Sequence, residues 1–270
     1  MDAAKVLESA RKEWSKYLKE GGIHRRRALN LYHRFLNQAW KLEDWGNYAR
    51  ALKELSVILL SYDIPEKIYQ AKRMLEEGAS LLYEKGLLRE ALMVQIAIFP
   101  ALLLLAELEP LKTTTILKDG LATVNNLLEM PEIENGDRPW LKFYEGRFYE
   151  EIAHWDREMR LNFRKKAYSC FLEAEKWPEV DLVRFARFQR ALMQIEDKEY
   201  DSAESLLKEC LSLAESSGCE RDIGEISQLL ASICEKKGDF KGANYFLKQT
   251  INCWQKFGRI VPRKRIDLNL

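Results

Sequence analysis

The sequence is short of the features that mark most enzymes and nucleic-acid-binding proteins. Its 270 residues include only three histidines and no glycine-rich phosphate loop, His-Glu-x-x-His or Gly-x-Ser-x-Gly pattern. The formal net charge is +1, so the chain has no global field that would recruit DNA, RNA or an acidic membrane. From these absences we expect a protein that is not an enzyme and that uses no cofactor or metal.

Long hydrophobic runs and paired cysteines are also scarce. The most apolar stretch, residues 91–106, is shorter than the roughly 18 residues of a membrane span and contains Gln95 and Pro100, so we expect it to be a buried helix. The charged start of the chain lacks the apolar run of a signal peptide. The five cysteines are an odd number without a Cys-x-x-Cys pair, which indicates free thiols in a reducing compartment. These features favour a cytoplasmic location without membrane contact.

Helical periodicity is the main positive signal. Apolar residues recur at steps of three, four and seven along most of the chain, as in the series Leu31, Phe35, Ala39 and Leu42. No convincing alternation with a period of two appears, and the glycines stand between the apolar series. Apolar residues make up 47% and charged residues 31% of the chain, which is typical of a folded protein with a charged surface. The sequence therefore predicts an all-α protein.

A short phrase occurs four times, and it indicates an internal repeat. Each copy has a turn residue, an aromatic residue or leucine two places later, and an alanine three places further on. The turn residues are Gly46, Gly86, Lys198 and Gly238. Another alanine stands twelve residues before the last one, giving the pairs Ala39 and Ala51, Ala79 and Ala91, Ala191 and Ala203, and Ala231 and Ala243. The phrase predicts antiparallel helical hairpins that end at a left-handed turn and cross closely at small side chains.

These residues resemble the tetratricopeptide repeat family, whose consensus has a small residue on the first helix and Gly-Asp-Tyr/Phe-x-x-Ala at the start of the second. Residues 237–243, Lys-Gly-Asp-Phe-Lys-Gly-Ala, are the copy most similar to it, and Phe35 and Leu75 fit the large residue four places before the first small one. The resemblance covers residues 28–98 and 184–256. The period departs from the family, being about 40 residues rather than 34. Three residues also depart from the family consensus: Arg187 and Arg190 stand where the family has large apolar residues, and Ser227 stands where it often has tryptophan. The resemblance implies a TPR-like fold of a longer-repeat type.

The middle of the chain, residues 99–183, is less regular. It predicts helices reaching about residue 129 and over 140–154 and 159–176, with a proline-bounded linker at 131–139. We expect a single domain over 1–270, with an internal break near 131–139 and a tail over 259–270. Its fold would be a right-handed α-solenoid of about six antiparallel helix hairpins, with twelve or thirteen helices and a degenerate middle.

Two groups of side chains are candidates for partner binding. Arg184, Arg187 and Arg190 fall at three-residue steps and share one helix face, while Arg157 and Arg160 belong to a second basic stretch. Facing a groove together, they would hold an acidic peptide or a phosphate backbone. The alternative is ordinary surface charge paired with neighbouring acids. Among the dense aromatic residues of the middle, Trp140 and Tyr144 are candidate exposed anchors, although most of this group has core spacing.

Two further patterns carry less weight. Glu151 and His154 have the Glu-x-x-His spacing of di-iron bundles, but no second copy exists, so we interpret them as a solvated helix face. The basic tail, residues 262–270, resembles both the docking peptides recognised by MAP kinases and a basic targeting signal. Because both motifs are short and common by chance, we favour a frayed terminus or a strand-like tail folded on the last helix.

Two hypotheses on function follow. The first is a non-enzymatic scaffold or regulatory adaptor that binds a partner protein or peptide in the concave groove of the solenoid. The second is a regulatory module that binds nucleic acid or another phosphate-bearing ligand through the arginine faces, with the near-zero net charge weighing against nucleic acid. Self-association stays open, because the ends of a solenoid need a polar cap or a partner.

Overall fold

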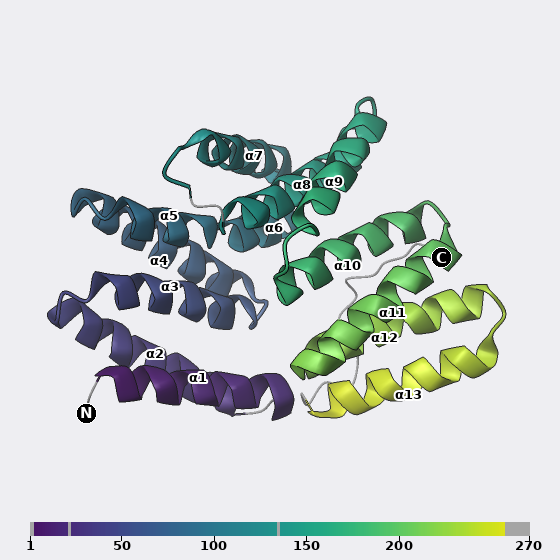
Figure 1. The fold of residues 1–270 in the computed structure, drawn as a ribbon, viewed down its shortest axis with the longest axis horizontal. Coiled ribbons are helices and arrows are strands. Elements are labelled where there is room, and N and C mark those ends of the chain that lie inside the picture. Colours follow the sequence, from purple (N-terminus) through teal and green to yellow (C-terminus); the bar gives the residue numbers. More distant parts are fainter. Residues whose placement is uncertain (1–2, 21–22, 134–135, 257–270) are drawn as a thin grey trace. The chain divides into compact units, whose positions relative to one another are not determined.

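The computed structural model describes residues 3–20, 23–133 and 136–256, and in these ranges the chain is all-helical (Figure 1). Thirteen helices and no strands occur there, which confirms the predicted all-α, solenoid-like fold class. The first seven are α1 Ala3–Glu20, α2 His24–Lys41, α3 Trp45–Leu60, α4 Pro65–Glu84, α5 Leu88–Ile96, α6 Phe99–Leu108 and α7 Thr113–Glu129. The others are α8 Arg138–Trp155, α9 Arg160–Ala174, α10 Val180–Glu196, α11 Tyr200–Ser217, α12 Glu220–Lys236 and α13 Phe240–Lys256.

The chain divides into two compact units. The first unit contains residues 1–11 and 26–186, and the second contains residues 12–25 and 187–270. The boundaries between the units fall inside α1, α2 and α10. The single-domain assignment, the break near 131–139 and the handedness of the solenoid stay predictions. The predicted tail, residues 259–270, lies outside the described residues.

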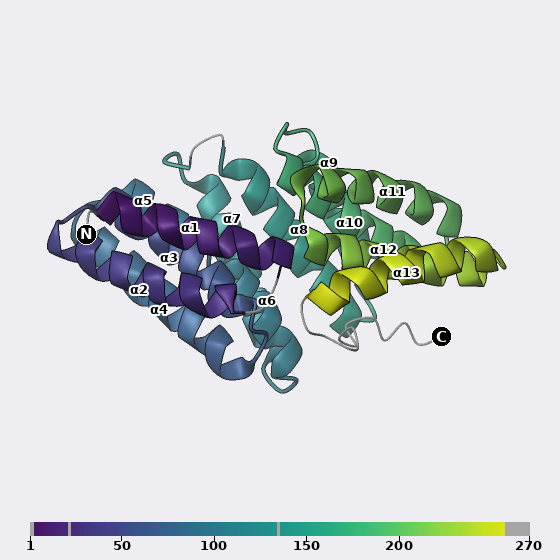
Figure 2. The ribbon, with the colours of Figure 1, turned by 90° about the horizontal axis from the view of Figure 1, so that it is seen from below.

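Neighbouring helices pack against each other within each unit. In the first unit α3 packs on α4 and α5, α4 on α6, α7 on α8, and α8 on α9, and Figures 1 and 2 show α2, α3 and α4 side by side. In the second unit α11 packs on α12, and α12 on α13. One core cluster of the first unit contains Phe99, Leu117 and Phe148, and a core cluster of the second unit contains residues from Ala191 to Cys253.

The predicted hairpin turn is present in four places with one geometry. A residue in the left-handed region ends the first helix in each case, namely Glu43, Gly86, Lys198 and Gly238. The amide of the following residue donates to the carbonyl five places earlier, as Asp44 does to Ala39, Leu87 to Leu82, Glu199 to Gln194 and Asp239 to Cys234. The second helix then starts at the next residue. The same left-handed residue and hydrogen bond also occur at Gly218 and Cys219, between α11 and α12, so this turn is a helix ending that the four hairpins share with another connection of the chain.

The first copy of the repeat begins three residues earlier than the sequence phrase suggests. Gly46 was expected in the turn, but it lies in the first turn of α3, and Glu43 takes the left-handed conformation. The Asp44 carboxylate caps α3 by accepting from the Asn47 amide, at 3.3 Å. Because this cap fixes the helix start, the positions equivalent to the alanine pairs hold Leu36 and Tyr48.

All eight alanines of the repeat are buried, none more than 6% exposed. Ala191, Ala203, Ala231 and Ala243 belong to a single core cluster of the second unit, as expected for close helix crossings. In the first hairpin, Ala39 and Ala51 supply small buried residues one helical turn beyond Leu36 and Tyr48.

One segment of the described chain, Leu88–Leu108, is long and apolar enough to cross a membrane by length and composition. It is made of two helices, α5 and α6, which are separated at Ala97 and Ile98. More than half of its most apolar window is buried inside the protein. Core packing therefore accounts for its hydrophobicity, as predicted for residues 91–106.

Candidate functional site

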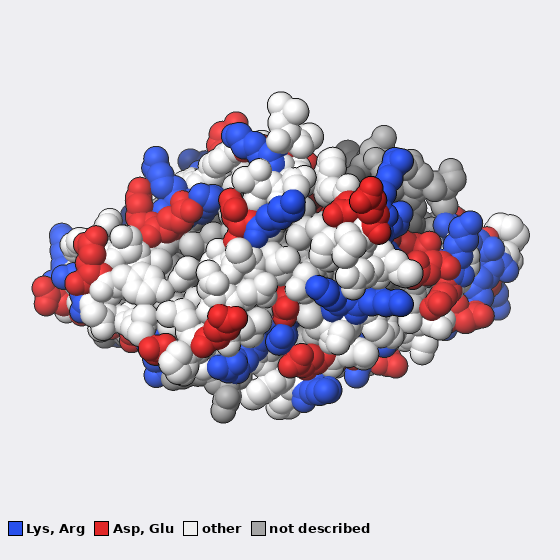
Figure 3. Space-filling view, turned by 90° about the horizontal axis from the view of Figure 1, so that it is seen from above, with Lys and Arg blue, Asp and Glu red and all other residues white. Residues whose placement is uncertain are grey.

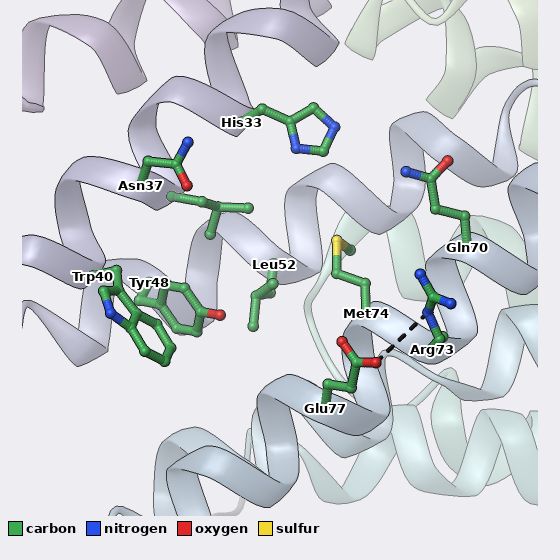
Figure 4. Close-up of a pocket in the computed structure, with 10 residues that line it drawn as sticks. His33, Asn37, Trp40, Tyr48, Leu52, Gln70, Arg73, Met74 and Glu77 are labelled. Carbon is green, nitrogen blue, oxygen red and sulfur yellow. Dashed lines mark ion pairs between the residues drawn. The ribbon is translucent and has the colours of Figure 1, made fainter.

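A cleft of about 260 Å³ opens in the first unit between α2, α3 and α4 (Figure 4). Helices α2 and α4 each contribute one face, and α3 contributes two side chains between them. The residues that line it are His33, Leu36, Asn37 and Trp40 from α2, Tyr48 and Leu52 from α3, and Gln70, Arg73, Met74 and Glu77 from α4.

Helical spacing explains why these side chains meet. The four residues from α2 and the four from α4 each follow the pattern i, i+3, i+4 and i+7, which places them on one helix face. Leu52 is 2% exposed and forms part of the floor. Gly78 allows α4 to approach this floor, because a β-carbon there would overlap the Leu52 side chain.

The cleft lies where the repeat departs from its alanine pairs. Leu36 and Tyr48 occupy the positions that hold Ala79 and Ala91 in the next hairpin, and both line the cleft. Larger side chains at a helix crossing hold the two helices farther apart than alanines do. We attribute the opening of the cleft to these two residues.

Three aromatic rings pack together at one end of the cleft. The ring centroids of Trp40 and Trp45 are 5.5 Å apart, and Tyr48 lies 5.8 Å from each of them. The interplanar angles are 80° for both pairs with Trp45 and 64° for Trp40 with Tyr48, so the rings meet edge to face. The Lys85 ammonium lies 4.6 Å from the centroid of Trp45. We call Trp40, Trp45 and Tyr48 the aromatic cluster.

The charges of the cleft are nearly balanced. Arg73 and Glu77 form an ion pair at 3.6 Å, but their side chains are 79% and 72% exposed, so the pair is weak. Desolvation, and to a lesser extent Glu77, raises the pKa of Tyr48, which therefore stays protonated. Desolvation and then Lys67 lower the pKa of His33, so its imidazole is neutral at pH 7.

The predicted aromatic anchors lie elsewhere in the first unit. Trp140 is half-buried, donates its indole N–H to the Glu179 carboxylate at 2.9 Å, and packs against Phe143 and Phe185. Tyr144 is also half-buried, and desolvation raises the pKa of its hydroxyl. Both rings belong to a network that continues to Phe99, which matches the core interpretation. Their role in partner binding stays a prediction.

The predicted arginines differ widely in exposure. Arg184 is 4% exposed, pairs with Asp181 at 2.8 Å and lies over the Phe185 ring. Arg187 pairs with Glu209 at 2.9 Å, and Arg190 is half-buried. Arg157 and Arg160 are exposed. Because these arginines are divided between the two units, their gathering in one groove stays a prediction. On the face shown in Figure 3, basic and acidic side chains are intermingled.

Metal and thiol chemistry find little support among the described residues. Glu151 pairs with Arg147 at 3.1 Å, His154 is exposed, and no group of three or more His, Cys, Asp or Glu residues is arranged to hold a metal in the ranges that the structure describes. None of the five cysteines, all within those ranges, forms a disulfide. Burial raises the pKa of Cys170 to about 12, which keeps it as an unreactive thiol.

Comparisons with known proteins add little to this description. No protein-family model matches the chain, and no curated protein sequence matches it significantly. Among solved structures, the chain is similar to the crystal structure of BtubC (BKLC) from P. vanneervenii, with 14% sequence identity and a TM-score of 0.46. The match covers 91% of this chain and 97% of that one. Nothing about function follows from a likeness of this size.

Sequence reasoning missed the cleft. The available signal was the pair Leu36 and Tyr48, which breaks the alanine rule, but it becomes visible only after the repeat is set in register on Glu43 rather than Gly46. The exposure of Trp40, at 47%, has no counterpart in the sequence pattern.

Proposed function

We propose that this chain is a TPR-like, non-enzymatic interaction protein of the cytoplasm that binds a segment of a partner protein in the cleft between α2, α3 and α4. The observation that carries the proposal is the lining of the cleft by one face each of α2 and α4, with an exposed tryptophan at its end. Such a surface offers many distributed contacts, as expected for a scaffold or adaptor.

The size of the cleft favours side chains of a polypeptide over a small molecule. Pockets for small ligands measure roughly 300–1,000 Å³ and enclose most of the ligand. At about 260 Å³ this cleft is smaller and is open between two helices. One or two side chains of an extended or helical segment would fill it while the rest of the segment lies along α2 and α4.

Trp40 is the expected energetic centre of the interface. Tryptophan is enriched among residues that dominate binding energies, and an exposed indole beside a concave, partly apolar floor is suited to this role. Leu36, Leu52 and Met74 supply the apolar floor, and Asn37 and Gln70 supply hydrogen-bonding groups above it.

The alternative of a phosphate-binding module through the arginine faces has less support. Arg184 and Arg187 already pair with carboxylates, so an incoming phosphate would have to displace Asp181 and Glu209. Self-association of the chain remains a separate prediction.

The proposal is tested by selecting peptides from a random display library on the full chain and measuring their affinities by titration calorimetry. We expect Trp40→Ala to weaken the binding of the selected peptides by about 30-fold or more, since truncation of a hot-spot residue costs about 2 kcal/mol or more. Trp155→Ala is the matched control, because Trp155 is similarly exposed, at 53%, and lies outside the cleft. Failure to select any peptide, or equal losses in both variants, would contradict the proposal.

A photo-crosslinking amino acid locates the segment independently. Placed at Asn37 it reports on the cleft, and placed at Lys53, an exposed residue of α3 outside the cleft lining, it serves as the control. Crosslinks of a selected peptide to the Asn37 variant alone would support the cleft. Crosslinks only to the Lys53 variant would exclude it.

A further inference from the structure

We infer that the aromatic end of the cleft recognises a basic side chain, a lysine or an arginine, in the partner segment. This inference rests on the proposed function and states the chemistry of the partner. It depends on the aromatic cluster, on Glu77 and on the position already taken by Lys85.

The geometry of the aromatic cluster is suited to a cation. Cations are attracted to the faces of aromatic rings, within about 6 Å of the centroid, because the ring quadrupole is negative there. In this cluster the rings meet edge to face at 64–80°, so each contact places the edge of one ring against one face of its neighbour and leaves the opposite face outside that contact. Trp40 is 47% exposed, which leaves ring surface within reach of an incoming side chain.

The cluster already binds one cation of the chain itself. Lys85, the C-terminal cap of α4, places its ammonium 4.6 Å from the Trp45 centroid, within the range of a cation–π contact. Lys85 therefore occupies the Trp45 ring, while Trp40 and Tyr48 are the two members of the cluster that line the cleft. A basic residue of the partner would make the same kind of contact with these two rings.

One charge beside these rings, that of Glu77, has the sign that a partner cation requires, whereas Lys85 on the Trp45 ring has the opposite sign. Figure 4 shows Trp40 and Tyr48 at one end of the cleft, Arg73 and Gln70 at the other, and Glu77 between them. The Glu77 charge acts on the Tyr48 hydroxyl, since it contributes to the raised pKa of Tyr48 after desolvation. The Arg73–Glu77 pair is long and exposed, so a partner cation would compete for Glu77 at little cost.

Other partner chemistries fit this end less well. A carboxylate would face Glu77 and the negative faces of the rings, and both contacts are unfavourable. An aliphatic side chain would gain burial against Trp40 but would leave Glu77 without a new partner. A lysine or arginine gains from both features, and its methylene stem would pack on the Leu36 and Leu52 surface.

The test compares a cation with its neutral isostere. The two probes are a capped trimethyllysine and its neutral analogue, in which a carbon atom replaces the quaternary nitrogen. Their binding to the isotope-labelled full chain is measured by NMR titration of the tryptophan indole N–H signals. We expect the cation to bind about 2-fold to 30-fold more tightly than the isostere, the range of a cation–π contact. Trp40→Leu, which keeps an apolar side chain without a π face, should abolish this preference, and Trp155→Leu should preserve it.

Two charge variants test whether cation binding depends on the charges beside the rings. Glu77→Gln should weaken the cation and leave the neutral probe unchanged. Lys85→Ala should tighten the cation, because it removes a competing charge and uncovers the Trp45 ring. Equal affinities of the two probes, no binding of either, or a preference that survives Trp40→Leu would each overturn the inference.

The display experiment separates this inference from the proposed function. Selected peptides that need Trp40 and carry an essential lysine or arginine would support both. Peptides that need Trp40 but tolerate replacement of every basic residue by norleucine would overturn the inference and leave the proposed function standing. Cation binding at Trp40 without any selectable peptide would contradict the proposed function while supporting the cation site.

Discussion

The hairpin α2–α3 and the hairpins of the second unit use the same turn, yet they pack their helices differently. The turns at Glu43, Lys198 and Gly238 share the left-handed residue and the following hydrogen bond across five residues. At the crossing beside the turn, the second unit has alanine pairs, Ala191 with Ala203 and Ala231 with Ala243, that are at most 3% exposed. The first hairpin has Leu36 and Tyr48 there, and both line a cleft.

The difference lies in the side chains at the crossing, because the turns are the same. The turn fixes the direction of the second helix, and the side chains at the crossing set how closely the helices approach. Where both are alanine, the crossing is filled and becomes core. Where they are leucine and tyrosine, both side chains line the cleft beside the neighbouring α4, which is the surface that we propose for partner binding.

The largest expected effect comes from exchanging the two kinds of crossing. Ala203→Tyr introduces a ring at a fully buried position and should lower the free energy of unfolding by about 3 kcal/mol through overpacking. The reverse change, Tyr48→Ala, removes a half-buried ring and should cost only about 1–2 kcal/mol, while weakening peptide binding in the cleft. Urea unfolding followed by circular dichroism measures both. If Ala203→Tyr is the milder change, the alanines do not mark a close crossing.

The fold was predictable from sequence because its signals are local. Apolar spacing, the glycines at 86 and 238 and the alanines twelve residues apart all act within one hairpin. The register of the first hairpin was wrong because two local signals compete there. Gly46 completes the repeated phrase, but Asp44 accepts a hydrogen bond from Asn47 and starts the helix earlier. Sequence matching cannot weigh a side-chain cap against a glycine.

The candidate site was not predictable in the same way. The cleft requires α4 to face α2 and α3, and this depends on packing between hairpins rather than on spacing within one. The arginine prediction placed Arg184, Arg187 and Arg190 on one helix correctly. It did not anticipate that Glu209, on the next helix, pairs with Arg187. Spacing predicts which side chains share a face, but not which charges another helix brings to them.

The hydroxyl groups of Tyr32, which is buried, and Tyr200, which is half-buried, should contribute differently to stability. Tyr32 of the first unit is 1% exposed and donates its hydroxyl to Glu54, at 2.5 Å, which also pairs with Arg11. Tyr32→Phe leaves the carboxylate without this donor and should cost about 1.5 kcal/mol. Tyr200 of the second unit is half-buried, and its hydroxyl lies 3.4 Å from Lys236, so Tyr200→Phe should change stability by less than about 0.5 kcal/mol. If urea unfolding shows that the two variants lose the same free energy of unfolding, the hydrogen bond from Tyr32 to Glu54 does not contribute to stability.

The four hairpin turns allow a third comparison, since each unit has one such turn with glycine and one with another residue at the left-handed position. No atom lies within 4 Å of a β-carbon added at Gly86 or Gly238, so Gly86→Ala and Gly238→Ala should each cost about 1 kcal/mol through backbone strain alone. Glu43→Gly and Lys198→Gly relieve the same strain but increase the freedom of the unfolded chain, so each should add only about 0.5 kcal/mol. Thermal unfolding of the four variants tests the shared turn. If the same kind of substitution stabilises one turn and destabilises its equivalent in the other unit, the two turns differ in backbone geometry.

The smallest expected effect is a difference in acid sensitivity, which arises in the second unit. Glu204 accepts from Lys208 at 2.6 Å and from Lys237 at 2.8 Å, and these two contacts lower the pKa of its carboxyl below the ordinary 4.5. A lowered pKa in the folded state stabilises the protein fully above pH 4.5, and this contribution is lost as the pH falls through the lowered value. Glu204→Gln should therefore reduce stability at pH 6 and narrow the difference in stability between pH 6 and pH 3.5. Glu235→Gln, an exposed change on α12 outside this ion-pair set, is the control and should keep the wild-type difference. If both variants lose stability equally on acidification, the Glu204 contacts do not link the folding of this unit to pH.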